Sequence, residues 1–175
     1  LTLYCLGEFM EKPEYDEEKP QCCCFTGHRN IDKLRYGRIS DELVRTVEEL
    51  ETRGITHYYA GGAIGFDLVA AVTVANIKVL VPDITMTLAL PYPGYNNSWS
   101  RADSEIFRKV MKRADEVIYV SEGYYGGCML ARDRFMVDRC GTCICYLEKA
   151  TGGTAYTVNY AIKKELDIIN IASAI

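Results

Sequence analysis

The sequence predicts an α/β fold of three layers, in which a mainly parallel sheet is flanked by helices. Short apolar runs alternate along the chain with stretches of helical periodicity, an alternation typical of βαβ units with right-handed crossovers. The run at residues 22–25 is apolar throughout, as strands are when helices cover both faces of their sheet. A glycine turn at residues 61–65 leads from another apolar run directly into a helical stretch.

The pattern predicts six strands and five helices, and the arrangement is Rossmann-like. In the first helix, Ile39, Leu43, Val47 and Leu50 recur at helical spacing before Gly54. The third helical stretch, from Ser100, begins like a capping box and is expected to present Ile106, Val110 and Ala114 to the core. Strands are expected at residues 22–25, 56–60, 85–90, 116–121, 142–147 and 167–171, and helices at 39–54, 68–80, 100–114, 128–139 and 155–166.

The 175 residues fit one domain large enough to bury a sizeable core. We expect this domain to span residues 21–175, preceded by an N-terminal arm at residues 1–20. Residues 1–10 are largely apolar and are expected to anchor on the domain or on a neighbouring subunit. Residues 11–20 form a polar run that contains Pro13 and ends at Pro20, which favours an extended conformation.

The composition bears on partners and on the cellular compartment. A net charge of −4 and an isoelectric point near 5.3 argue against nonspecific binding to nucleic acid, so we expect a small ligand instead. The eight cysteines include three adjacent ones, which favours a reduced, cytoplasmic protein over a disulfide framework. No apolar run approaches the roughly 20 residues that cross a bilayer, and neither membrane association nor secretion is indicated.

The cysteines suggest core packing rather than metal or redox chemistry. Cys140 and Cys143 form a C-x-x-C motif, but it follows a predicted helix, whose C-terminus disfavours a thiolate. No second such motif or histidine pair completes four zinc ligands. We therefore expect no metal site and no cofactor.

Five loops with unusual composition follow the predicted strands, at the edge where open parallel sheets bind ligands. Glycines there let backbone N–H groups approach an anion, and a helix N-terminus adds roughly half a positive charge. His28 and Arg29 suit an anionic ligand, with a plain surface turn as the alternative. Asp67 either complements the helix dipole or binds a ribose. Trp99 and Tyr95 either sandwich a base or cap the core, whereas His57, at the opposite end of its strand, is expected to be structural.

Together these loops resemble a known family. The segments FTGHR at 25–29, GGAIGFD at 61–67, YYGGC at 124–128, MVD at 136–138 and GGT at 152–154 are similar to the YpsA-like branch of the SLOG superfamily, Rossmann-like domains related to DprA and to LOG phosphoribohydrolases. The resemblance covers residues 21–172. It implies nucleotide or nucleotide-sugar ligands at the glycine-rich edge, often in homo-oligomers, and it does not imply one activity.

One departure from the LOG enzymes bears on catalysis. Those enzymes resemble this chain at Arg132 and Met136, but their glycine loop carries a catalytic Glu where this chain has Thr157. A hydroxyl does not accept a proton at neutral pH as a carboxylate does, so whether the chain is an enzyme stays open. The remaining catalytic candidates are Asp67, Arg132 and Asp138.

The expected function is binding or sensing of a nucleotide-derived small molecule, such as a nucleotide, a nucleotide-sugar or an ADP-ribose-like compound. The alternative is an N-glycoside-cleaving enzyme that acts on nucleoside monophosphates. The predicted ligand-binding residues are Thr26, Gly27, His28, Arg29, Gly61, Gly62, Ala63, Gly65, Asp67, Pro91, Trp99, Ser121, Arg132, Gly152, Gly153 and Thr154.

Overall fold

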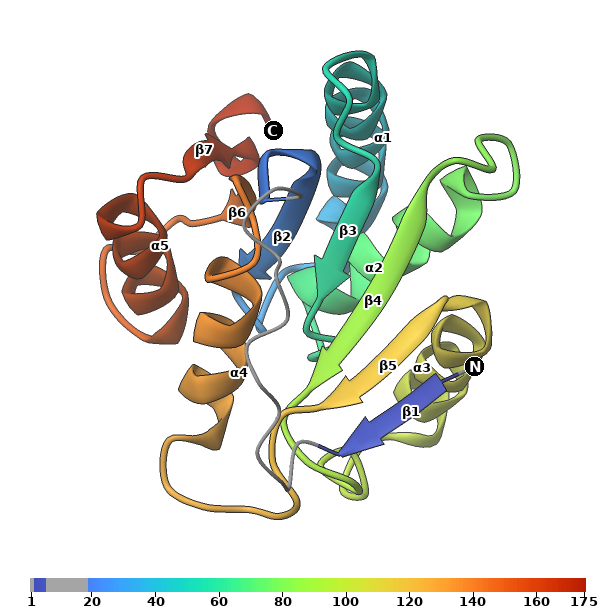
Figure 1. The fold of residues 1–175 in the computed structure, drawn as a ribbon, viewed down its shortest axis with the longest axis vertical. Coiled ribbons are helices and arrows are strands. Elements are labelled where there is room, and N and C mark those ends of the chain that lie inside the picture. The colour runs from blue at the N-terminus through green and yellow to red at the C-terminus, as the bar shows by residue number, and fades with distance from the viewer. Residues whose placement is uncertain (1, 6–18) are drawn as a thin grey trace.

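A computed structural model describes residues 2–5 and 19–175 and has a seven-stranded sheet at its centre (Figure 1). The strand order is β1-β5-β4-β3-β2-β6-β7, and all neighbouring strands run parallel. The predicted Rossmann-like α/β fold is thus confirmed. The strands are β1 (Thr2–Cys5), β2 (Cys22–Gly27), β3 (His57–Ala60), β4 (Thr85–Leu90), β5 (Glu116–Tyr119), β6 (Thr142–Tyr146) and β7 (Asp167–Asn170).

Five α-helices cover the two faces of the sheet. Helices α1, α2 and α3 pack on one face, and α4 and α5 pack against each other on the other face (Figure 1). Short 3-10 helices lie at Lys19–Gln21, Lys33–Arg35 and Ile171–Ala174. The α-helices are α1 (Tyr36–Thr52), α2 (Phe66–Ile77), α3 (Arg101–Arg113), α4 (Cys128–Val137) and α5 (Gly153–Lys163).

The helices form where the hydrophobic spacing predicts them, with one error, at Ile106. Helix α1 buries the predicted apolar stripe against the sheet, and Ser100 caps α3 by accepting a hydrogen bond of 3.1 Å from the backbone N–H of Asp103. On α3, however, Ile106 is 41% exposed. Phe107 is buried in its place, whereas Val110 and Ala114 are buried as predicted.

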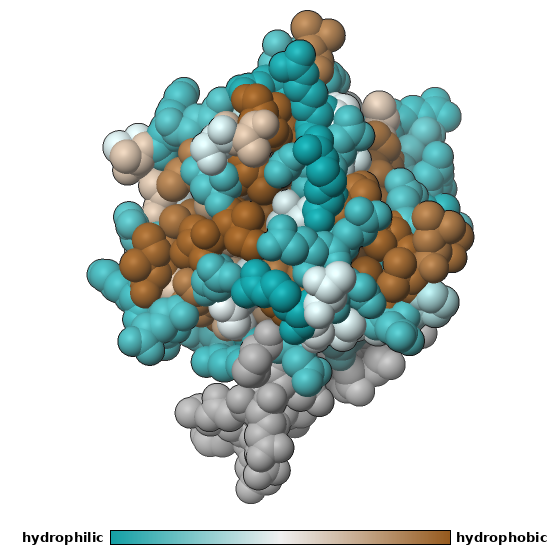
Figure 2. Space-filling view, turned by 90° about the horizontal axis from the view of Figure 1, so that it is seen from above, coloured by the Kyte–Doolittle hydropathy of each residue, from teal (hydrophilic) through white to brown (hydrophobic). Residues whose placement is uncertain are grey.

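The path of the chain determines where the helices on the two faces of the sheet separate. The chain runs from β2 outwards through β3, β4 and β5, and then crosses to the other side of β2 to form β6 and β7. Helices on opposite faces therefore diverge beyond the carboxyl ends of β2 and β6, which is the place where ligands bind in sheets of this kind. Figure 2 shows the opposite end, where the strands begin, and there hydrophilic residues are interspersed with hydrophobic ones.

Part of the predicted N-terminal arm extends the sheet. Residues 2–5 form β1, which lies parallel to β5 in the register Thr2 to Glu116 and Cys5 to Tyr119. The polar run and the apolar residues 6–10, for which an extended arm and an anchor are predicted, lie outside the described residues, apart from the 3-10 turn that begins at Lys19.

The described cysteines are buried thiols. Seven free cysteines are buried in the core, and burial raises the pKa of Cys140 to about 11 and that of Cys145 to about 12. No group of three or more potential metal ligands occurs among the described residues. Within the same part of the chain, no helix is both long and apolar enough to cross a membrane.

Candidate functional site

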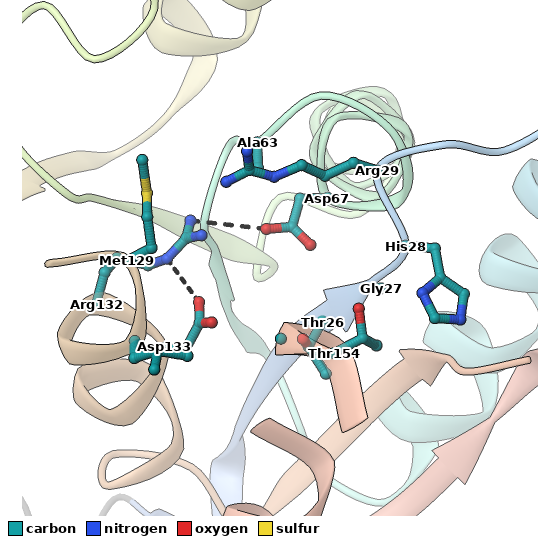
Figure 3. Close-up of a pocket in the computed structure, with 12 residues that line it drawn as sticks. Thr26, Gly27, His28, Arg29, Ala63, Asp67, Met129, Arg132, Asp133 and Thr154 are labelled. Atoms are coloured by element: carbon teal, nitrogen blue, oxygen red, sulfur yellow. Dashed lines mark ion pairs between the residues drawn. The ribbon is translucent and has the colours of Figure 1, made fainter. Parts of the chain in front are cut away.

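A cavity of about 340 Å³ opens beyond the carboxyl end of β2, between the helices of the two faces (Figure 3). Its walls come from four segments: the loop after β2, the loop and first turn of α2, the first turns of α4 and the first turn of α5. The residues that line it are Thr26, Gly27, His28, Arg29, Ala63, Asp67, Met129, Leu130, Arg132, Asp133, Gly153 and Thr154.

A buried guanidinium organises one side of this cavity. Arg132 of α4 is only 3% exposed. Its Nη1 lies 3.6 Å from Oδ2 of Asp67, and its Nε lies 2.7 Å from Oδ1 of Asp133. Its Nη1 also donates a hydrogen bond to the carbonyl of Gly61. Figure 3 shows the two carboxylates on either side of the guanidinium. Two carboxyl groups thus share one buried cation.

Asp67 has an altered protonation equilibrium in this setting. Burial raises the pKa of its carboxyl to about 7, against the opposing effects of Arg132, Arg29 and the backbone N–H of Ala63. The nearby Asp133 raises this pKa further. A carboxyl with a pKa near neutrality can both donate and accept a proton at physiological pH, which is the property that acid–base catalysis requires.

Three lining residues are not among the predicted ones, Met129, Leu130 and Asp133, and Asp133 is the one with a charged side chain. Its Oδ2 accepts a hydrogen bond of 3.0 Å from the hydroxyl of Thr157, which also donates to the carbonyl of Gly153. Thr157 itself is buried and does not line the cavity. Thr157 of α5 stands where the LOG enzymes have a carboxylate, and its hydroxyl contacts the carboxylate of Asp133 from α4.

The start of helix α5 forms another side of the cavity. Helix α5 begins at Gly153 after Gly152, which has φ of 93°, and among the described residues no side chain caps its first turn. The first backbone N–H groups of α5 therefore lie beside the cavity that Gly153 and Thr154 line. Arg29 is exposed, and Figure 3 shows its side chain extending towards Ala63 and Asp67.

His28 lines the cavity, but its ring is engaged in holding a loop. Its Nε2 accepts hydrogen bonds from the backbone N–H groups of Glu148 at 3.0 Å and Lys149 at 3.3 Å. An Nε2 that accepts carries no proton, so any proton on the neutral ring is on Nδ1. The ring thereby links the loop after β2 to the loop that precedes α5.

Three predicted glycines shape the walls without lining the cavity. A Cβ on Gly61 would meet the guanidinium of Arg132 and would lie 2.7 Å from Oδ2 of Asp67. Gly65 has φ of 92° and packs against the backbone of the loop after β2. Gly62 has φ of 63°, and its carbonyl accepts a 3.0 Å hydrogen bond from the hydroxyl of Tyr95.

The remaining predicted residues lie away from the cavity. Trp99 packs edge-to-face on Phe107, with ring centroids 5.3 Å apart, at the margin of the core. The hydroxyl of Ser121 donates to the carbonyl of Pro91 at 2.7 Å and joins two neighbouring loops. Asp138 follows the last turn of α4, where it accepts a hydrogen bond from Tyr160 and pairs with Lys164. Asp67 and Arg132 are thus the catalytic candidates that line the cavity.

The fold is similar to that of two solved DNA processing proteins. DprA from Streptococcus pneumoniae matches 87% of this chain with a TM-score of 0.61 and 18% sequence identity. DprA from Helicobacter pylori matches 86% of this chain with a TM-score of 0.60 and 15% sequence identity. This chain spans 50% and 65% of those two chains.

The second comparison corrects one expectation. The structure of the Helicobacter pylori protein is described as revealing a unique mode of single-stranded DNA binding. The expectation that nucleic acid is not a partner is therefore wrong, because it rests on net charge, and a protein with a similar fold binds single strands. Net charge sums over the whole surface and does not report the charge inside one cavity.

Relatives and a family model agree with the resemblance of the motifs. The SPbeta prophage-derived protein YoqJ of Bacillus subtilis is 27% identical over 74% of this chain and 83% of its own length. A UPF0398 protein of Halalkalibacterium halodurans is 23% identical over 79% of this chain and 72% of its own. The model of the YspA SLOG family, YpsA, matches residues 23–172, almost the whole of the domain. The chain therefore belongs to the YspA SLOG family.

Proposed function

We propose that the cavity binds a nucleotide-derived small molecule, such as a nucleotide, a nucleotide-sugar or an ADP-ribose-like compound. The observation that carries this proposal is the division of one cavity into an anion-binding side and a carboxylate side. Its volume of about 340 Å³ is at the lower end of the range for small-molecule sites, which suits a single nucleotide unit.

A phosphate group belongs at the start of α5. The uncapped N–H groups of the first helical turn and the positive end of the helix dipole both favour an anion there. Arg29 extends towards Ala63 and Asp67, and it can add a charge-assisted hydrogen bond to a phosphate that lies between its side chain and the start of α5.

The sugar belongs at the carboxylate side. Asp67 and Asp133 line that side and can accept hydrogen bonds from ribose hydroxyls, as acidic residues do in dinucleotide-binding sheets. Carboxylate oxygens repel a phosphate at short range, which favours the orientation with the sugar at this side.

A titration with paired ligands tests this proposal. The affinities of nucleoside monophosphates and of the matching nucleosides are measured by calorimetry for the wild type, for Arg29→Ala and for Arg108→Ala, an exposed arginine of α3 that serves as the control. Arg29→Ala should weaken phosphate-bearing ligands by about 1.5 to 3 kcal/mol and leave nucleosides unchanged. Equal losses for both ligand forms, or no binding by the wild type, would contradict the proposal. ADP-ribose and a single-stranded oligonucleotide complete the screen.

The position of Asp133 favours a second function, cleavage of an N-glycosidic bond. A protonated Asp67 can donate its proton to the leaving base, while Asp133 accepts a proton from the water that attacks the sugar carbon. Water is consumed, the bond between carbon and base nitrogen breaks, and the free base and the sugar phosphate are released.

This second function is tested by product analysis. Each nucleoside monophosphate that binds is incubated with the wild type, Asp133→Asn and the control Asp138→Asn, and the free base is measured by chromatography. Release of base by the wild type and the control, and not by Asp133→Asn, supports an enzyme. Tight binding without any release supports a binding protein.

A further inference from the structure

A second cavity, of about 390 Å³, adjoins the first, and Arg29 lines both. Its other walls include Asn30 and Lys33 from the segment between β2 and α1, Tyr36 at the start of α1, and Ile64 from the loop after β3. Arg29 is the one predicted ligand-binding residue in the lining of this cavity.

The two cavities share their loops. The segment after β2 passes along the first cavity at residues 26–29 and along the second at residues 29–36. The loop after β3 contributes Ala63 to the first and Ile64 to the second. Arg29 is the residue that the two linings have in common, so it lies at the boundary between the two cavities.

The second cavity offers cations and an aromatic ring to a ligand. Arg29 and Lys33 are exposed, and neither forms an ion pair with a carboxylate of the described residues. Tyr36 is half-buried, at the first turn of α1. These are the groups that bind nucleic-acid backbones and bases, since cations pair with phosphates and bases stack on aromatic rings.

The two carboxylates at this cavity are already engaged. Oδ1 of Asp32 accepts a 3.0 Å hydrogen bond from the backbone N–H of Leu34. Oδ2 of Asp103 accepts a 2.6 Å hydrogen bond from the hydroxyl of Ser100. Both carboxylates are held at helix starts by these hydrogen bonds and keep their charge, so a phosphate would depend on direct contact with Arg29 and Lys33 rather than on a net positive charge of the cavity.

We propose that the second cavity binds a second nucleotide unit, so that the full ligand consists of two nucleotides joined through phosphate. In this arrangement Arg29 contacts the phosphate that links the two nucleotides, and Lys33 contacts the phosphate or the sugar of the second nucleotide. Tyr36 stacks on the base of the second nucleotide. This inference rests on the proposed function, because the first unit occupies the first cavity. The shared chemistry fits both a free dinucleotide and the end of a single strand.

The test compares ligands of one and two units. The affinities of adenosine monophosphate and of 5′-phosphorylated diadenylate are measured by calorimetry for the wild type, Lys33→Ala, Tyr36→Ala and the control Lys163→Ala, an exposed lysine near the end of α5. The wild type should bind the dinucleotide at least about tenfold more tightly. Lys33→Ala should lower dinucleotide affinity about fivefold, and Tyr36→Ala about tenfold, while affinity for the monophosphate stays constant.

The outcomes separate the two proposals. Equal affinities of the wild type for both ligands, or equal losses for both in Lys33→Ala, overturn the second subsite and leave the proposed function intact. No binding of any mononucleotide overturns the proposed function, and with it this inference. Lys33 lies in an exposed 3-10 turn, so its variant tests the site even where Tyr36→Ala disturbs α1. A ten-nucleotide single strand that binds more tightly than the dinucleotide identifies a strand as the source, and equal affinity identifies a free dinucleotide.

Discussion

Substitution of Gly61 by alanine tests the central arrangement of the site, the buried guanidinium of Arg132. The added Cβ would overlap this guanidinium and would lie 2.7 Å from Oδ2 of Asp67. Both side chains line the cavity, so they can make room for the Cβ only by giving up contacts that hold them in place. The overlap must therefore displace Arg132 from the carbonyl of Gly61 and from at least one carboxylate.

The energetic cost follows from the contacts that are lost. A hydrogen bond from a charged donor contributes about 1.5 to 3 kcal/mol, and disrupting a buried ion pair costs about 3 to 5 kcal/mol. We therefore expect Gly61→Ala to lower the free energy of unfolding by about 3 to 5 kcal/mol. For a domain of this size, the melting temperature should fall by roughly 6 to 20 °C.

The measurement is urea unfolding, with Gly123→Ala as the matched control. Gly123 has no heavy atom within 4 Å of the position of an added Cβ, so this substitution should change the unfolding free energy by no more than about 0.5 kcal/mol. Unfolding free energies of the two variants that agree within about 0.5 kcal/mol would refute the reasoning. In that case the guanidinium would not be confined as described.

Three further predictions concern pH, a helix cap and the thiols. The pKa of Asp67 is raised from 3.8 to about 7 in the folded protein, so unfolding between these pH values releases its proton. The stability of the wild type relative to Asp67→Asn should therefore fall from pH 4 to pH 7, by at most about 1.4 kcal/mol per pH unit. Calorimetric melting of both proteins checks this, and a parallel pH dependence of the two proteins contradicts it. Ser100→Ala should cost about 1 kcal/mol of unfolding free energy because α3 loses its cap, a loss that urea titration would detect. All eight cysteines should react with a thiol reagent after denaturation without prior reduction, and the buried ones far more slowly before it; a substantial disulfide content would overturn the assignment of a reduced protein.

The features that the sequence predicts well are local ones. The strand at residues 85–90 and the cap at Ser100 depend on residues within a few positions of each other, and both occur as predicted. The cavity also follows from local motifs, since the carboxyl ends of parallel strands meet at one edge and bring the loop after β2 close to the glycines of α5.

The features that the sequence leaves undetermined depend on contacts between helices. On α3, residues 106 and 107 are both apolar and both fit a helical repeat with Val110, so the spacing alone does not decide which of them faces the core. On α4, nothing in the sequence distinguishes Asp133 from Asp138 as the carboxylate of the site. Packing against α5 decides it, because Thr157 meets Asp133 whereas Asp138 meets Tyr160.

The crossing of the chain from β5 to β6 has a consequence for how the site is assembled. Every residue that lines the first cavity comes either from before position 68 or from after position 128. The intervening segment, with β4, α3 and β5, supplies sheet and core but contributes no cavity-lining residue. Two fragments divided in the exposed loop near Gly123 would each carry half of the lining residues. Ligand binding would then report that the fragments have associated, which would make the site a sensitive readout for fragment complementation.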